Sequence, residues 1–167
     1  IVQEAIAARA AIEACLDFNR PGSYFALQGG GIGWGLPATL GIKLALPDRP
    51  VIGVIGDGSA MYSIQALWTA AHHNIPAVWL IHNNGSYRIL KANMVSYLKG
   101  SGRVPQFDGF ELWGPDIDFA KVAQSFGVHG RRVEHPDEVR PALEEAQELG
   151  KPALVDVVVD SSLDEEL

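Results

Sequence analysis

The sequence predicts an α/β fold: a doubly wound, mostly parallel sheet of six strands flanked by helices. Short runs rich in β-branched residues alternate with stretches of helical periodicity along the whole chain. Most of the short runs are apolar on both faces, as strands buried inside a parallel sheet must be. The 167 residues, 47% hydrophobic and 20% charged, suffice for one globular domain with its own core.

Each predicted element follows from its local pattern. Apolar runs predict strands at residues 1–3, 23–27, 51–55, 77–82, 128–133 and 154–159. Apolar residues three and four apart predict helices at residues 8–18, 35–46, 64–73, 118–126 and 137–149. Asp118 is an expected N-cap, and Gly127 and Gly150 follow the last two helices where left-handed backbone is common. In such a sheet, ligands bind at the carboxyl ends of the strands.

Residues 92–115 interrupt this alternation. The segment contains four glycines, two prolines and several aromatic residues, and no clear periodicity. A stretch of this length without regular structure is uncommon in a compact domain unless it serves a function. Because it starts shortly after a polar strand end, we expect it to be an active-site lid loop.

Composition and charge exclude several classes of protein. The formal net charge is −7 and Lys and Arg form no stripe, which argues against nucleic-acid and membrane partners. Neither a signal peptide nor an apolar run long enough for a membrane span is present, so a cytoplasmic location is expected. The single cysteine, Cys15, lies in an apolar helical stretch and is expected to be a buried core thiol. The chain begins at Ile1 in mid-pattern, which suggests a piece of a longer polypeptide.

Two polar motifs follow two of the predicted buried strands. Gly56-Asp57-Gly58-Ser59 ends the strand at 51–55, and Asn83-Asn84-Gly85-Ser86 ends the strand at 77–82. Parallel strands bring both motifs to the same edge of the sheet. An acid, an amide oxygen and backbone N–H groups suit a hard cation that itself holds a phosphate.

A glycine-rich segment, residues 29–35, lies between a strand and a helix and contains Ile32 among its glycines. So many glycines indicate backbone lying against a ligand or another segment. Residues 33–38 also fit G-x-G-x-x-A, so dinucleotide binding remains an alternative, although Pro37 lies inside the turn. Glu4, at the end of the first strand, is expected to be a solvated carboxylate. The histidines lack metal-ligand spacing and are expected to be solvated or capping.

Together these motifs resemble the thiamine-diphosphate-binding motif. The match rests on Gly56-Asp57-Gly58-Ser59 and Asn83-Asn84. It extends through residues 21–24, 29–37, 62–70, 118–120 and 151–155. The chain is most similar to the carboxy-terminal cofactor domain of benzoylformate-decarboxylase-type and acetolactate-synthase-type enzymes.

The resemblance implies thiamine diphosphate and Mg²⁺ as cofactors. Asp57, the Asn84 side chain and the Ser86 backbone carbonyl would bind Mg²⁺. The backbone N–H groups of Gly58 and Ser59 would hold the diphosphate.

The resemblance also assigns residues to the rest of the cofactor. Ile32 would hold it bent, and the Gly30 carbonyl would accept a hydrogen bond from its aminopyrimidine. The remaining cofactor-binding residues would be Gly31, Gly56 and Tyr87.

As function, the resemblance implies decarboxylation of a 2-oxoacid, with the cofactor as electron sink. An acetolactate-synthase-like carboligase domain, a natural subunit of a two-chain decarboxylase and a binding module without catalysis remain alternatives. A remote alternative is an NAD- or FAD-binding domain. In the family, the activating glutamate comes from a pyrimidine-binding domain of the same or a partner chain. Residues 1–167 are thus expected to be one domain of a three-domain enzyme, inactive alone, with no catalytic residue of its own.

The resemblance further implies a homodimer or homotetramer for the full enzyme. One departure concerns the end of the first strand, where relatives place Ser or Thr against the diphosphate and this chain has Ile6-Ala7. Phosphate binding could be weaker here or use a different anchor. The substrate stays open, because its contacts would come from the other domain and from residues 92–115.

Overall fold

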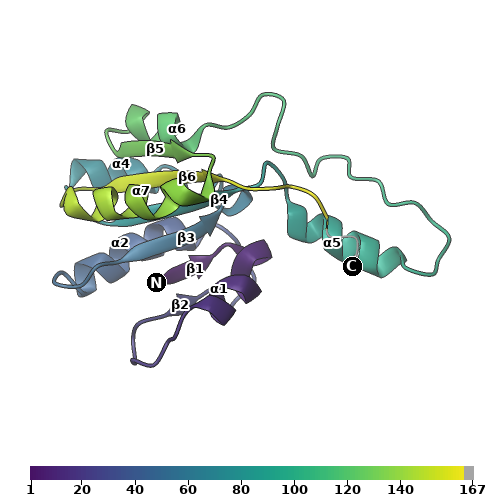
Figure 1. Cartoon of the computed structure of the whole chain (residues 1–167), viewed down its shortest axis with the longest axis horizontal. Coiled ribbons are helices and arrows are strands. Elements are labelled where there is room, and N and C mark those ends of the chain that lie inside the picture. Colours follow the sequence, from purple (N-terminus) through teal and green to yellow (C-terminus); the bar gives the residue numbers. More distant parts are fainter. Residues whose placement is uncertain (164–167) are drawn as a thin grey trace.

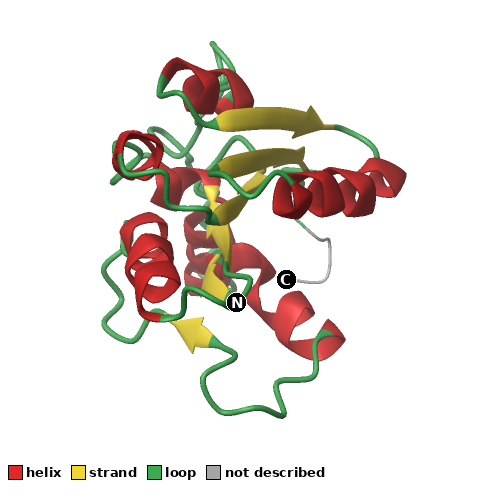
Figure 2. Cartoon of the chain, turned by 90° about the vertical axis from the view of Figure 1, so that its left-hand side faces the viewer, coloured by secondary structure: helices red, strands yellow, loops and turns green. Residues whose placement is uncertain are grey.

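Residues 1–163, which the computed structural model describes, form a six-stranded sheet in which every pairing is parallel. The strands are β1 (Val2–Glu4), β2 (Phe25–Ala26), β3 (Ile52–Gly56), β4 (Val78–Asn83), β5 (His129–Val133) and β6 (Ala153–Val158). Their order across the sheet is β2-β1-β3-β4-β6-β5, and helices cover both faces (Figure 1; Figure 2). The predicted fold class is confirmed, and every predicted strand overlaps an observed one.

The helices agree less closely with the prediction. They are η1 (Ile6–Ala8), α1 (Arg9–Cys15), α2 (Gly35–Ala45), α3 (Asp57–Ala60), α4 (Ala66–His72), α5 (Arg88–Leu98), α6 (Phe119–Ser125) and α7 (Pro136–Glu148). The short α3 and the longer α5 were not expected, and α1 ends before residue 18. The predicted capping residues of α6 and α7 are confirmed. Asp118 accepts a hydrogen bond from the Lys121 N–H, and Gly127 and Gly150 have positive φ.

Two apolar layers hold the helices against the sheet. On one face, α2, α4 and α6 pack around Trp79 and Leu154, with Leu67 and Phe119 among the fully buried side chains. On the other face, α7 packs against a smaller cluster that includes Val155. Burial of each large apolar side chain contributes roughly 1.5–3 kcal/mol, so these layers account for most of the fold's stability.

Cys15 corrects one expectation, because it is exposed rather than buried. It ends α1, which has no buried residue. The helix lies beside β1 and β2 (Figure 1) and belongs to neither apolar layer. Its run of alanines looked like a core stretch, although small side chains alone do not bring a helix into a core.

The sheet contains a topological switch point between β1 and β3. These strands are neighbours, but the next strand in the chain is added on opposite sides, β2 beside β1 and β4 beside β3. Crevices form at such points, outside the carboxyl ends of the strands. The segments that follow β1, β3 and β4 therefore come together at one edge.

None of the helices within residues 1–163 is long and apolar enough to cross a membrane.

Candidate functional site

A cavity of about 350 Å³ lies at the switch point. Its walls are residues 5–7 after β1, residues 56–59 after β3, residues 82, 84, 86–90 and 93 from the end of β4 and α5, and Gly30 and Ile32. All the residues that the sequence assigned to cofactor binding line this cavity, except Gly31. The structure thus brings the two strand-end motifs and the glycine-rich segment together.

Asp57 is the buried acid of this cavity. It begins α3 and is 3% exposed. Its Oδ1 accepts a hydrogen bond from the Gly58 N–H at 2.8 Å, and its Oδ2 accepts one from the Asn84 N–H at 3.1 Å. Burial raises the pKa of Asp57, and the backbone N–H groups offset this only in part. Within residues 1–163, Asp57 forms no ion pair.

The turn after β4 presents its oxygens beside Asp57. Asn84 Oδ1 accepts hydrogen bonds from the Ser86 N–H at 3.0 Å and from the Ser86 hydroxyl at 3.2 Å. Both residues are buried. The turn is therefore shaped by its own side chains as well as by Asp57. A carboxylate, an amide oxygen and backbone carbonyls form the hard oxygen donor set that Mg²⁺ or Ca²⁺ takes.

Gly58 is required by a close contact with Tyr87. A Cβ placed on Gly58 would lie 2.5 Å from Tyr87 Cε1. The aromatic ring therefore packs against the backbone that follows Asp57. This contact joins the segment after β3 to the start of α5.

Glu4 corrects a second expectation, because it is fully buried rather than solvated. Its Oε1 accepts a hydrogen bond from the Trp34 N–H at 3.0 Å, and its Oε2 accepts one from the Gly35 N–H at 2.7 Å. These donors belong to the start of α2, where a negative charge is favourable. Glu4 thus fixes the end of the glycine-rich segment that carries Gly30 and Ile32 to the cavity.

Sequence reasoning missed the side chains that α5 and the end of β4 add to the cavity. They are His82, Arg88, Ile89, Leu90 and Asn93. Burial lowers the pKa of His82, so its imidazole is neutral near neutral pH. Arg88 Nε donates to the Ser162 carbonyl at 2.8 Å, which connects α5 to the carboxy-terminal segment. Only a prediction of α5 could have indicated the four of these residues that lie on that helix, whereas His82 ends the predicted strand at residues 77–82.

The expected lid, residues 92–115, begins inside α5. The segment between α5 and α6 is then tied down near its middle, because the Tyr87 N–H donates to the Phe110 carbonyl and the Leu112 N–H donates to the Gly85 carbonyl. Glu111 strengthens the attachment by accepting from Lys91 Nζ at 2.7 Å. Residues 110–112 are therefore attached directly to the Asn84–Ser86 turn.

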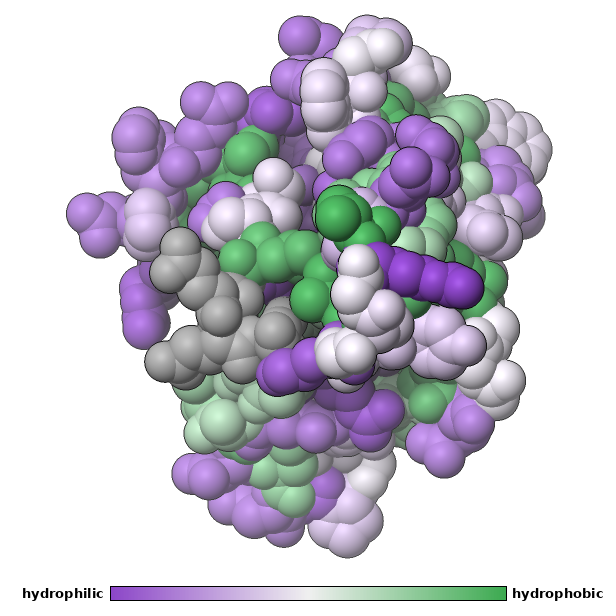
Figure 3. All heavy atoms as spheres, turned by 90° about the vertical axis from the view of Figure 1, so that its right-hand side faces the viewer, coloured by the Kyte–Doolittle hydropathy of each residue, from purple (hydrophilic) through white to green (hydrophobic). Residues whose placement is uncertain are grey.

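The side of the molecule on which α5 lies is mixed in character. Hydrophobic residues gather near the middle of this face and hydrophilic ones predominate toward its rim (Figure 3).

A doubly wound domain with a buried acid and an oxygen-rich turn at its switch point is a domain for a phosphate-bearing cofactor. Residues 7–157 match the family described as thiamine pyrophosphate enzyme, C-terminal TPP binding domain. The chain belongs to this family. The match supports the thiamine cofactor over the dinucleotide alternative.

Individual relatives agree with this assignment. The chain is 41% identical over 142 residues to benzoylformate decarboxylase of Pseudomonas aeruginosa, covering 85% of this chain and 26% of that protein. It is 39% identical over 147 residues to the acetolactate synthase large subunit of Haemophilus influenzae, covering 87% of this chain and 25% of that one.

A solved structure is similar throughout. The thiamine diphosphate-dependent 4-hydroxybenzoylformate decarboxylase of Rhodococcus jostii RHA1 superposes with a TM-score of 0.86 at 39% identity, over 99% of this chain and 30% of that one. The chain therefore spans between a quarter and a third of the length of these relatives.

Proposed function

We propose that this chain is the thiamine-diphosphate- and Mg²⁺-binding domain of an enzyme that decarboxylates a 2-oxoacid. The Asp57 carboxylate, the Asn84 side-chain oxygen and the Ser86 backbone carbonyl hold the cation, which in turn holds the diphosphate. The backbone N–H groups of Gly58 and Ser59 bind the diphosphate directly. Because the Gly58 N–H already donates to Asp57, the larger share falls to Ser59.

The observation that carries the proposal is the environment of Asp57. Within residues 1–163, the buried Asp57 carboxylate is held by backbone N–H groups and has no positive charge beside it to offset its desolvation. A divalent cation supplies that charge. Asn84 Oδ1 can join it by giving up the Ser86 hydroxyl, which is the longer of its two contacts.

Bound thiamine diphosphate supplies the electron sink for the loss of CO₂ from a 2-oxoacid. The residues of this chain bind and orient it. Ile32 would present an apolar surface to the cofactor, and the Gly30 carbonyl would accept a hydrogen bond from its aminopyrimidine, since both residues line the cavity. The Tyr87 ring packs on Gly58, next to Asp57.

Calorimetric titration tests this proposal. Thiamine diphosphate should bind in the presence of Mg²⁺ and lose its affinity in EDTA, whereas NAD should not bind. The Asn84→Ala variant should lose the Mg²⁺-linked binding. Asp118→Ala is a matched control, because Asp118 lies outside the cavity and caps α6. Binding of thiamine diphosphate that ignores Mg²⁺ would contradict the assignment.

A second candidate reaction is carboligation by an acetolactate-synthase-like enzyme. It is favoured by the 39% identity to the Haemophilus acetolactate synthase large subunit, close to the 41% identity to benzoylformate decarboxylase. The products separate the two reactions. A decarboxylase releases an aldehyde and CO₂ from one 2-oxoacid. An acetolactate-synthase-like carboligase releases CO₂ from one 2-oxoacid and joins the remaining acyl carbon to a second 2-oxoacid, so its organic product is a hydroxy-oxo acid and not an aldehyde.

We further propose that this chain contributes half of an active site. A pyrimidine-binding domain of the same or a partner chain supplies the activating glutamate, in a homodimer or homotetramer. The support is that the chain spans 26% of its benzoylformate decarboxylase relative. The purified 167-residue chain should therefore bind cofactor without turning over a 2-oxoacid. Turnover by this chain alone would refute the proposal that the active site is shared between two domains.

A further inference from the structure

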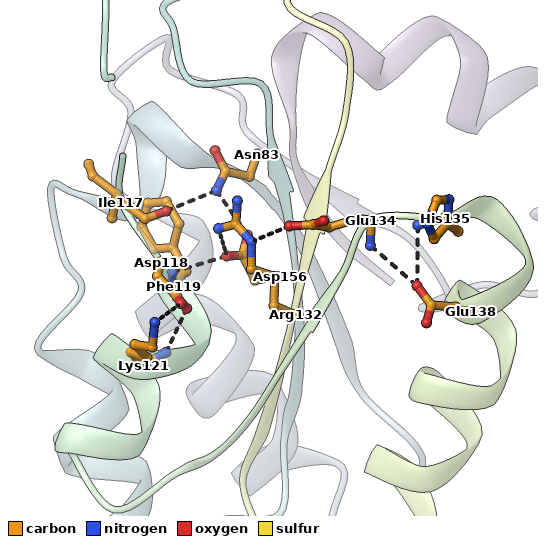
Figure 4. Close-up of polar contacts among 10 residues, drawn as sticks. All are labelled: Asn83, Ile117, Asp118, Phe119, Lys121, Arg132, Glu134, His135, Glu138 and Asp156. Carbon is orange, nitrogen blue, oxygen red and sulfur yellow. Dashed lines mark hydrogen bonds and ion pairs between the residues drawn. The ribbon is translucent and has the colours of Figure 1, made fainter. Parts of the chain in front are cut away.

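A second buried carboxylate, Asp156 on β6, lies behind the proposed cation-binding turn. It is fully buried, and burial raises its pKa. Its Oδ2 accepts hydrogen bonds from the Phe119 N–H at 3.0 Å and from Arg132 Nη1 at 3.1 Å. Its Oδ1 accepts one from Asn83 Nδ2 at 3.0 Å. Figure 4 shows these contacts converging on one side chain.

Asn83 connects Asp156 to the turn. It is the last residue of β4 and immediately precedes Asn84. While Nδ2 donates to Asp156 and to the Ile117 carbonyl, Oδ1 accepts from the Gly85 N–H at 3.3 Å. The amide therefore has its orientation set on one side by Asp156, and on the other side it holds the backbone of the turn.

The turn is consequently held between two acids. On the cavity side, Asp57 accepts from the Asn84 N–H, and on the far side, Asp156 acts through Asn83. The far side opens onto a separate cavity of about 320 Å³ that Asn83 and Arg132 also line. Asp156 lines neither cavity, so it is not placed to touch a ligand.

We propose that Asp156 is a positioning residue, which orients Asn83 and thereby presets the turn Asn84–Ser86 to receive the cation. Arg132 supports it by holding Asp156 from β5. Residues that orient metal ligands typically change metal affinity by about 10- to 100-fold when replaced. The part of this proposal that concerns the cation rests on the proposed function. The part that concerns the conformation of the turn is independent of it.

The first test measures Mg²⁺ affinity at saturating thiamine diphosphate, in the complete protein that carries this chain. Asp156→Ala should raise the apparent dissociation constant about tenfold or more. Val155→Ala is the matched control, because Val155 is equally buried on the same strand but packs against α7. The control should lose stability with its Mg²⁺ constant unchanged. Equal Mg²⁺ constants in the two variants would overturn the proposal.

The path through Asn83 has its own readout. Asp156→Ala added to Asn83→Ala should change the Mg²⁺ constant by less than about twofold, because the connection is already cut. Fully additive effects would refute the connection. If Asp156→Ala does not fold, Arg132→Gln should still weaken Mg²⁺ binding severalfold. Arg131→Gln should not, since Arg131 pairs with Glu145 of α7 instead.

Amide hydrogen exchange separates this proposal from the proposed function. Without Mg²⁺ or cofactor, exchange at Gly85 and Ser86 should be about tenfold faster in Asp156→Ala than in Val155→Ala. Equal exchange rates would overturn the positioning role even if Mg²⁺ binds. If the unmodified protein binds no Mg²⁺, the proposed function fails, and the exchange rates alone decide whether Asp156 sets the turn.

Discussion

Asp57 and Asp156 are two buried carboxylates near the same edge of one sheet, yet their surroundings differ. Asp57 accepts from backbone N–H groups and forms no ion pair within residues 1–163. Asp156 accepts from Asn83, from the Phe119 N–H and from Arg132, with which it forms an ion pair. Burial alone therefore does not assign a role to an acid. The lack of a countercharge within residues 1–163 agrees with the proposed cation-binding role of Asp57, and the full set of partners agrees with the proposed supporting role of Asp156.

The largest expected effect is that of replacing Asp57, the acid on the cavity side of the turn. Asp57→Ala should weaken Mg²⁺-linked binding of thiamine diphosphate by more than about 100-fold, which exceeds the usual effect of a residue that only supports a ligand. Calorimetric titration with and without Mg²⁺ measures it. A loss no greater than that of Asp156→Ala would mean that the two acids do not differ in role.

The next effect is on stability. Here the replacement of Asp156 should have the larger effect and the replacement of Asp57 the smaller one. Asp156→Asn should lower the free energy of unfolding by about 2–4 kcal/mol, because the amide keeps one acceptor oxygen where the carboxylate had two. At least one of the three donors then faces an NH₂ group, and Arg132 loses its buried ionic partner. Asp57→Asn should cost less than half as much, since it removes a buried charge that has no cationic partner. Urea denaturation without Mg²⁺ checks the order, and equal losses would contradict it.

A packing change beside Asp57 should have an intermediate effect. Gly58→Ala should cost about 1–3 kcal/mol, because its methyl group would overlap the Tyr87 ring. Gly41→Ala is the control, since a Cβ there meets nothing within 4 Å and the site is in α2. That variant should be neutral or slightly stabilising. If Gly58→Ala is equally neutral in thermal unfolding, the Tyr87 contact does not constrain the backbone.

The smallest effect is a dependence of stability on pH. The folded-state pKa of Asp57 is raised by burial from the model-compound value of 3.8. Its stabilising contribution is thus complete below that value and is lost as pH rises through the raised pKa. Relative to Asp57→Asn, the unmodified protein should lose stability as the pH rises above about 4, until the raised pKa of Asp57 has been passed. Saturating Mg²⁺ and thiamine diphosphate should reverse that trend, which urea titrations at each pH would detect.

The sheet and the two strand-end motifs at the cavity could be predicted from sequence because both depend on local patterns, whereas the roles of Gly30, Ile32 and Ser86 came from the family resemblance. Buried strands are recognised by continuous apolar runs, and their order brings Asp57 and Asn84 to one edge. The role of Glu4 could not be predicted, since its partners lie 30 and 31 residues away. Nor could that of Asp156, which meets Asn83 across 73 residues. No periodicity predicts which distant backbone N–H groups a buried acid will meet.

The helix α5 shows a different limit. Only Lys91 of its residues is buried, while Leu90 and Tyr97 are exposed. A helix without a buried apolar face leaves no amphipathic pattern to recognise. The cavity residues on α5, including Ile89 and Asn93, could therefore not be predicted from the sequence pattern.

The attachment at Glu111 has a consequence for how the chain tolerates change in length. Because residues 110–112 are bound to the turn after β4, the stretch between α5 and α6 behaves as two separate loops, residues 99–109 and 113–118. Closing a loop costs only about 0.6 kcal/mol more for each doubling of its length. The first loop could therefore grow, shrink or be cut by a protease while the Asn84–Ser86 turn, the proposed cation site, keeps its shape.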